Sequence, residues 1–420
     1  MMTQDFSVGT KHGINYTLCM GLGQHIEVNK MKRLDVYEKI SEEIIKSDYS
    51  VIISVGPDNV QYLSGATLPF LYGYPDRPVF VVWPKDTDPW IICPEEWGES
   101  VKSMSWIKHV YTYEEGKGDK NQAIKKLTEK INKFMHKGTT IGIDYNRISN
   151  TLYSSLLNEL GDFEIVDCST FLRNMRMIKT KDEVSLLEEV AYRVDHSIVG
   201  AAHHVIVTHS KTEMAFAEDI RVHCIERELD TVGHHSMAQA VSGEHTKKFW
   251  PLIDRYSVGW EKMLLEDEIV RMSMISSLDG YWSDASRTLI MGEPTREQTE
   301  AFQGIVKLRE KAKQIIKPGI KCSEIYRELI LESEKMEIKL LIELGMGHGI
   351  GRTDYEPPYI KEDDDTEIKQ GMVLVLDPVV YGPENEIVRS KDTILVTDTG
   401  CRILGWYINW RAPYIAAYNL

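Results

Sequence analysis

The chain has 420 residues, roughly two to three times the size of a typical single domain, so we expect two packed domains. Its composition of 42% hydrophobic and 27% charged residues excludes a low-complexity or collagen-like protein. The formal net charge of −15 repels phosphate backbones and anionic lipid heads. We therefore expect neither nucleic acid nor a membrane as a partner.

The longest apolar runs, such as residues 79–83, are the length of a strand and fall far short of the ~20 residues that cross a bilayer. The first eleven residues lack the basic and apolar regions of a secretory signal. The six cysteines are scattered and include no C-x-x-C pair, which excludes a disulfide framework and a zinc ribbon. We expect a cytoplasmic protein with reduced cysteines.

The first part of the chain alternates between strand-like and helix-like patterns. Apolar periodicity predicts strands at 49–54, 78–83 and 140–144 and a helix at 122–137, which indicates a mixed α/β domain. A break at 167–170 is followed by a helical pattern over 175–205. We place the domain boundary at this break, giving domains 1–168 and 169–420.

The second part repeats one order of elements. Predicted helices at 181–204 and 212–228 lead into strands, and predicted helices at 296–316 and 322–336 precede strands at 373–376 and 393–396. This order suggests an internal duplication of about a hundred residues per unit. The fold class is therefore α/β (α+β), with a pseudo-two-fold second domain.

Four short strings occur in an order that resembles the pita-bread family, which comprises the methionine and Xaa-Pro aminopeptidases, prolidase and creatinase. They are Arg-Met-Ile-Lys-Thr-Lys-Asp-Glu at 176–183, Gly-Tyr-Trp-Ser-Asp-Ala-Ser-Arg-Thr at 280–288, Gly-His-Gly-Ile-Gly at 347–351 and Gly-Met-Val-Leu-Val-Leu-Asp-Pro at 371–378. The resemblance implies a creatinase/prolidase-like N-terminal domain, a pita-bread catalytic domain and a homodimer.

The metallopeptidases of this family hold two divalent ions with two Asp, one His and two Glu, a ligand set suited to activating a bridging water. The resemblance assigns these five positions to Ser273, Asp284, His348, Asp377 and Lys391. Asp284 and His348 match, Asp377 is one methylene short, and the other two positions have lost their ligands. The remaining charge does not balance two divalent ions, so we expect no catalytic metal and no cofactor, with Lys391 replacing a metal's charge.

Plainer interpretations compete with this one. Asp279 or Asp392 would enter the ligand set if the register were wrong, although a strand sends neighbouring side chains to opposite faces. Lys391 could snorkel to solvent, and Asp284 could form a structural ion pair with Arg287 or another cation. His348 could be a buried structural histidine, and the aromatic residues near the strings could belong to the core.

The resemblance also implies groups for acid/base chemistry and for binding a small zwitterionic substrate. His348 is the strongest acid/base candidate, because imidazole exchanges protons near neutral pH. The full candidate set comprises the catalytic residues His348, Asp354 and Glu356 and the substrate-binding residues Asp284, Asp377, Lys391, Arg77, Tyr355 and Trp250.

These features predict a metal-independent hydrolase that cleaves a C–N bond in a small zwitterionic or guanidino compound, in the manner of creatinase or ectoine hydrolase. Ser286 stands where creatinase has a Glu, and Tyr355 stands where the peptidases have a second His. Three alternatives remain open: a lyase of the dimethylsulfoniopropionate type, an Xaa-Pro-peptidase-like enzyme with a residual metal, and a non-catalytic binding protein on the same fold. The sequence does not identify the substrate.

Overall fold

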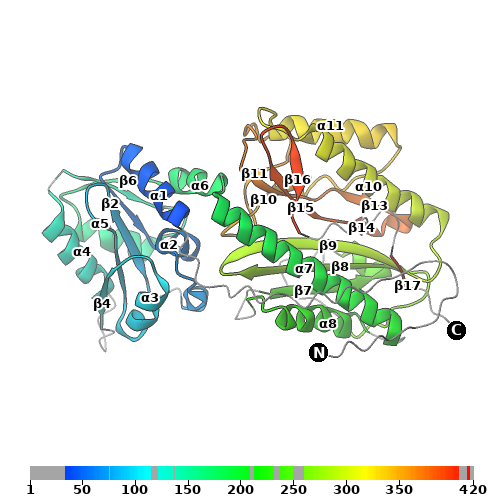
Figure 1. The fold of residues 1–420 in the computed structure, drawn as a ribbon, viewed down its shortest axis with the longest axis horizontal. Helices are drawn as coiled ribbons and strands as arrows, with labels where there is room; N and C mark the ends of the chain where they lie inside the picture. Colours follow the sequence, from blue (N-terminus) through cyan, green and yellow to red (C-terminus); the bar gives the residue numbers. More distant parts are fainter. Residues whose placement is uncertain are drawn as a thin grey trace, which may run out of the picture. The chain divides into compact units, whose positions relative to one another are not determined.

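The computed structural model describes residues 34–74, 76–114, 122–136, 138–208, 212–230, 236–248, 260–405 and 414–416. All of them belong to one compact unit, Arg33–Leu420. Within it, two groups of elements each surround their own sheets (Figure 1). None of the helices in these ranges combines the length and apolarity needed to cross a membrane.

The N-terminal group is built on a six-stranded mixed sheet with the order β4-β3-β2-β1-β5-β6. Its strands are β1 (Val51–Ser54), β2 (Phe80–Pro84), β3 (Trp90–Pro94), β4 (His109–Tyr113), β5 (Thr140–Ile143) and β6 (Glu164–Asp167). Alternate residues of β1 enter different apolar clusters: Ile52 packs on one face, and Val51 and Ile53 pack on the other. A sheet that is buried on both faces must be covered by helices on both sides.

The helices of this group provide that cover. They are α1 (Leu34–Lys46), α2 (Pro57–Ser64), α3 (Gly98–Met104), α4 (Gln122–Phe134), α5 (Asn150–Glu159) and α6 (Ser169–Met177), with short 3-10 turns η1 (Pro69–Tyr72) and η2 (Glu95–Trp97). Residues of α1, α2, α3 and α6 pack in the cluster that contains Ile52, whereas residues of α4 and α5 pack with Val51 and Ile53. The result is a three-layer α/β/α arrangement.

The connection between the two groups contains one helix that the sequence predicted and one that it did not. The chain forms α6 up to Met177, where only a break was expected at 167–170, and then starts a separate helix, α7 (Lys181–Thr208), at the predicted place. The backbone N–H of Glu183 donates to Thr180 Oγ1 at 3.3 Å, and the N–H of Thr180 donates to Glu183 Oε2 at 2.9 Å. This reciprocal capping begins the new helix. The boundary at 168/169 stays a prediction.

The C-terminal group contains two larger sheets and a two-stranded ribbon. The first sheet has the order β17-β9-β8-β7, the second the order β11-β10-β12-β15-β16, and β13 pairs with β14. The strands are β7 (Ser236–Ser242), β8 (Ile269–Leu278), β9 (Tyr281–Met291), β10 (Gly347–Gly349), β11 (Glu356–Tyr359), β12 (Val373–Leu376), β13 (Val379–Tyr381), β14 (Ile387–Arg389), β15 (Asp392–Val396), β16 (Cys401–Ile403) and β17 (Tyr414–Ala416).

In the described part of this group, four long helices pack on these sheets. They are α7, α8 (Glu213–Glu226), α10 (Arg296–Ile315) and α11 (Cys322–Lys335), with 3-10 turns η3 (Gly243–Lys247) and η4 (Pro383–Asn385). Figure 1 shows α7 running along the sheet of β7, β8 and β9. One apolar cluster joins residues of all four helices to both sheets, for example Ile198, Ile220, Met272, Ile305 and Leu374. The predicted order, in which a helix pair precedes strands twice, is confirmed.

Candidate active site

The hairpin of β8 and β9 fixes one side of the candidate site. Leu278 pairs with Tyr281, so only Asp279 and Gly280 form the turn, and both have positive φ, at 51° and 71°. Asp-Gly is a preferred sequence for such two-residue turns. Because the turn fixes the register, Ser273 lies directly opposite Ser286, and its Oγ donates to Ser286 Oγ at 3.0 Å.

The second sheet presents His348 from its short strand β10. The residue is buried, and its partners across the sheet are Tyr359 on β11 and Val375 on β12. His348 Nδ1 lies 2.9 Å from the carbonyl oxygen of Gly349. A carbonyl only accepts, so Nδ1 carries the proton of this hydrogen bond, and Nε2 is the nitrogen available to other groups.

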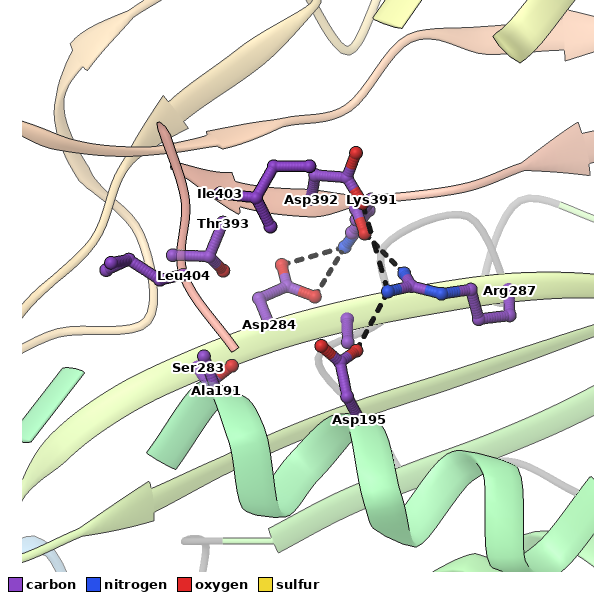
Figure 2. Close-up of a pocket in the computed structure, with 11 residues that line it drawn as sticks. Ala191, Asp195, Ser283, Asp284, Arg287, Lys391, Asp392, Thr393, Ile403 and Leu404 are labelled. Carbon is purple, nitrogen blue, oxygen red and sulfur yellow. Dashed lines mark hydrogen bonds and ion pairs between the residues drawn. The ribbon is translucent and has the colours of Figure 1, made fainter. Parts of the chain in front are cut away.

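Asp284 on β9 lies between His348 and Lys391. Lys391 Nζ donates to Asp284 Oδ1 at 2.8 Å and to Oδ2 at 2.7 Å, and His348 Nε2 lies 3.5 Å from Oδ2. Figure 2 shows the Lys391 ammonium directed at both oxygens of Asp284. Burial alone would raise the pKa of Asp284, but Lys391 and His348 outweigh it and hold the pKa well below its ordinary value. The carboxylate is therefore ionised. Lys391 is itself buried, so the snorkelling alternative is wrong.

Asp377 follows β12 and binds a second cation. Arg389 Nε donates to Asp377 Oδ1 at 2.7 Å and Arg389 Nη2 donates to Oδ2 at 2.5 Å, a two-pronged ion pair. Lys391 Nζ lies 3.9 Å from Asp377 Oδ2. The ammonium thus lies within ion-pair distance of both carboxylates.

Asp392, adjacent to Lys391, binds different partners. Its carboxylate accepts from Arg309 Nε at 2.8 Å, and Arg287 Nη2 lies 3.8 Å away. Arg287 in turn donates to Asp195 Oδ1 on α7 at 2.8 Å, as Figure 2 shows. The strand therefore separates Asp392 from Lys391, as the alternation of side chains predicts. Asp284 therefore forms its ion pair with another cation, Lys391, and Arg287 binds Asp195 instead.

Tyr355 lies against the imidazole. Its ring centroid is 4.4 Å from that of His348 and 5.0 Å from that of Tyr359, which gives a row of three rings. Tyr355 and Tyr359 are half-buried. Asp354, a second predicted acid, is half-buried in the connection between β10 and β11. The structure therefore places the ring of Tyr355 beside the imidazole of His348. Asp354 is six residues from His348 in the sequence.

Glu356, the third predicted acid/base residue, belongs to a separate buried ion-pair network. Lys179 Nζ donates to Glu356 Oε1 at 2.9 Å, Thr353 Oγ1 donates to Oε2 at 3.1 Å, and Arg176 Nη2 lies 3.5 Å from Oε2. Arg176 also donates to Asp58 Oδ2 on α2 at 2.6 Å. Both oxygens of Glu356 are engaged in holding α6 and β11 together, so we leave it out of the proposed catalytic set.

The two remaining predicted residues are Arg77 and Trp250. Arg77 donates from Nη1 to Glu96 Oε2 at 3.0 Å, and its guanidinium lies over the rings of Tyr74 and Trp97. These partners all belong to the N-terminal group of elements. Trp250 lies outside the described residues.

Sequence reasoning missed Arg389, which binds Asp377. The signal was present in Arg389-Ser390-Lys391, because residues two apart in extended chain share a face. The backbone confirms this spacing: the Arg389 N–H donates to Thr288 Oγ1 at 3.1 Å and the Lys391 N–H donates to the Ser286 carbonyl at 3.0 Å. The segment therefore runs alongside β9 and sends both cations to the site.

The donor set does not fit the pair of divalent ions that the family's metallopeptidases hold. Both oxygens of Asp284 accept from Lys391, and both oxygens of Asp377 accept from Arg389. Ser273 contributes a neutral hydroxyl that donates to Ser286. A divalent pair needs several free, negatively charged oxygens, and these carboxylates are already neutralised.

Two family models match this chain. The model described as Metallopeptidase family M24 matches residues 190–398, and the Creatinase/Prolidase N-terminal domain matches residues 37–178. The chain belongs to the pita-bread family. The predicted fold, a creatinase-like N-terminal domain followed by a pita-bread domain, is confirmed.

The relatives are proteins of similar length. The Xaa-Pro dipeptidase of Pyrococcus horikoshii is 25% identical over 379 residues, which cover 87% of this chain and 95% of the relative. The Xaa-Pro dipeptidase of Pyrococcus furiosus is 26% identical over 294 residues, or 66% of this chain and 77% of the relative. The structure of an X-Pro aminopeptidase from Thermotoga maritima has a TM-score of 0.75 at 18% identity and covers 90% of this chain and 99% of its own. It shows a shared fold.

These relatives correct the predicted reaction. We expected a creatinase- or ectoine-hydrolase-like enzyme acting on C–N bonds other than peptide bonds, and this prediction is wrong because the curated relatives are Xaa-Pro dipeptidases. The prediction failed because the replacement of two metal-ligand residues shows only that the charge of the site has changed. They contain no information about the bond on which the site acts.

Proposed function

We propose that this chain is a peptidase of the Xaa-Pro dipeptidase type, which binds short peptides at the His348 site. The curated relatives with this name match along most of the chain, and this supports a peptide as the substrate.

The observation that carries the proposal is the orientation of His348. Its Nδ1 is held by the Gly349 carbonyl at 2.9 Å, and its Nε2 is directed toward Asp284 at 3.5 Å. An imidazole that is held through Nδ1–H keeps the lone pair of Nε2 for proton transfer, and a carboxylate beside Nε2 stabilises the imidazolium that forms. His348 would accept a proton from the attacking water and return it to the leaving amine.

Neighbouring groups would position the peptide. The half-buried ring of Tyr355 offers an apolar surface beside the imidazole, suited to a proline ring or another apolar side chain. No step of this chemistry is assigned to a metal, because the donor set does not fit one.

The test is hydrolysis of a dipeptide panel. Purified protein is incubated with Gly-Pro, Ala-Pro and Phe-Pro, with Pro-Ala as the reversed control, each with and without added Mn²⁺, and released proline is measured. We expect proline release from the Xaa-Pro peptides only. His348→Asn should lower kcat/KM on the order of 10²-fold or more, whereas the exposed-site variant His136→Asn should leave it unchanged. The absence of release under all conditions would contradict a peptidase.

A second candidate, a peptide-binding protein without turnover, is favoured by one observation. Asp284 and Asp377, which occupy ligand positions in the metallopeptidases, are each paired with an internal cation. This candidate predicts that Xaa-Pro peptides raise the melting temperature by mass action while no proline appears. Binding with turnover and binding without it are therefore separated by one product assay.

The homodimer, the cytoplasmic location and the domain boundary at 168/169 belong to this proposal. Light scattering after gel filtration checks the homodimer. The expected mass is twice that of the 420-residue chain.

A further inference from the structure

The candidate site contains as many fixed cations as carboxylates. Asp284 and Asp377 are buried, and so are Lys391 and Arg389, the two cations bound to them. The four groups together carry no formal net charge. A buried site of this kind offers a divalent cation no electrostatic gain to offset the loss of its water shell.

The ammonium of Lys391 lies where a metal ion chelated by Asp284 would lie. Its Nζ lies 2.8 and 2.7 Å from the two oxygens of Asp284 and 3.9 Å from Asp377 Oδ2, between the carboxylates. A divalent ion bound by the same carboxylate would lie about 2.0–2.6 Å from these oxygens. The ammonium and the ion would therefore compete for the same space and for the same lone pairs.

Arg389 blocks the second carboxylate in another way. Its Nε and Nη2 donate to the two oxygens of Asp377, at 2.7 and 2.5 Å. A guanidinium keeps its charge at any ordinary pH. The Arg389 N–H and the Thr288 hydroxyl are joined at 3.1 Å, which anchors the backbone beneath the side chain. The guanidinium is thus held in place and is not a loose surface group.

We propose that Lys391 and Arg389 are resident counter-ions that occupy the two cation positions of a latent divalent-metal site. In this proposal the protein excludes Mn²⁺, Co²⁺ and Zn²⁺ from the site by its own side chains, and carboxylates in place of Ser273 and Lys391 convert it into a metal site. The proposal concerns cation binding, so its test does not depend on the reaction that the site performs.

The first experiment uses the wild-type protein. The protein is dialysed against Mn²⁺ or Co²⁺, washed, and analysed for bound metal, while calorimetry measures the heat of metal addition. We expect well below one equivalent of bound metal and a melting temperature that is unchanged by a chelator. About two tightly bound equivalents, removed by a chelator with a loss of thermal stability, would overturn the proposal, and this result needs no variant to fold.

The second experiment opens the site. In the Ser273→Asp/Lys391→Glu variant, the ammonium is removed and two carboxylates are added next to Asp284 and His348. We expect at least one equivalent of Mn²⁺, bound about 100-fold more tightly or better than by the wild type. The control is Lys307→Glu on α10, which makes the same charge change as Lys391→Glu at an exposed position and should bind no additional metal.

The outcomes distinguish this inference from the peptidase proposal. A folded double variant that binds no more Mn²⁺ than Lys307→Glu would overturn the counter-ion role, whatever the result of the peptide assay. Failure of the peptide assay, with metal gained by the double variant, would leave the counter-ion role intact and remove the peptidase. Circular dichroism establishes that each variant is folded before its metal content is compared.

Discussion

The charge of Asp284 is set by its neighbours and not by solvent. Burial opposes ionisation of this carboxyl, whereas the Lys391 ammonium at 2.7 Å and His348 at 3.5 Å favour it. Its pKa is lowered, so the pair stabilises the fold above the ordinary carboxyl range near pH 4, and this stabilisation is lost as the pH falls toward the lowered pKa. At neutral pH the pair is fully charged.

Replacing Lys391 tests this balance. We expect Lys391→Met to lower the free energy of unfolding by about 3–5 kcal/mol at pH 7, because it leaves a buried carboxylate without its main counter-charge. Without Lys391, burial raises the pKa of Asp284, so the deficit should shrink between pH 7 and pH 5 as the carboxyl takes up a proton. Urea unfolding at both pH values measures the effect.

The double variant Asp284→Asn/Lys391→Met is the control for that experiment. It removes both charges, so we expect it to recover most of the lost stability and to show little dependence on pH between 5 and 7. A double variant as unstable as Lys391→Met would contradict a charge effect and indicate a packing defect.

At this scale the sequence predicted Asp284, His348 and Lys391 but not the pairing of Asp377. The family's ligand positions indicated the first three, and the alternation of a strand separated Lys391 from Asp392. Arg389 was missed because it corresponds to none of those ligand positions and its role depends on the path of the chain beside β9. A short sequence motif does not specify the path that the chain takes beside β9.

At the scale of elements, β10 and β11 pack so closely that they leave no room for a Cβ atom at Gly349. A Cβ on Gly349 would meet the backbone carbonyl of Pro357 within contact distance, and neither strand can move without disturbing His348. A Cβ on Gly400, by contrast, would meet no atom within 4 Å. The glycine beside the candidate base is therefore required by its neighbour strand.

This contrast gives a second prediction. We expect Gly349→Ala to destabilise the protein by about 1–3 kcal/mol through overpacking, and to lower any activity further than its stability explains. Gly400→Ala should be close to neutral. Chemical denaturation of both variants measures the difference, and equal stability of the two would show that the strands separate at little cost.

Apolar periodicity predicted most of the elements, including α4, α10 and β12, because each presents one clear apolar face or run. It missed α6, which lies where only a break was expected at 167–170. The boundary between α6 and α7 is set by the hydrogen bonding of Thr180 with Glu183, which involves polar side chains that a hydrophobic pattern ignores.

At the scale of the whole molecule, a chain of buried ion pairs joins elements that are far apart in sequence. Asp58 on α2 binds Arg176 on α6, and Glu356 on β11 binds both Arg176 and Lys179. Burial would raise the pKa of Asp58, but Arg176 and Arg147 lower it below its ordinary value. These pairs make the stability of α2, α6 and β11 interdependent.

The third prediction concerns this chain of ion pairs. We expect Glu356→Gln to lower the free energy of unfolding by about 3 kcal/mol, because Lys179 and Arg176 lose a buried counter-charge. Glu188→Gln, which breaks the exposed pair with Arg402, should cost less than about 1 kcal/mol. Thermal unfolding followed by two spectroscopic probes gives both values. Similar losses in the two variants would contradict the special position of Glu356.

The start of α7 leads to a consequence for biosynthesis. Asp35 on α1 accepts from Thr180 Oγ1 at 3.0 Å and from the backbone N–H of Asp182 at 3.0 Å, so a residue near the beginning of the described chain completes the cap of α7. During translation Asp35 and Asp58 leave the ribosome well before Arg176 and Thr180 exist. The elements up to β6 are therefore complete first, and they offer two carboxylates on which the nascent α6 and α7 can begin.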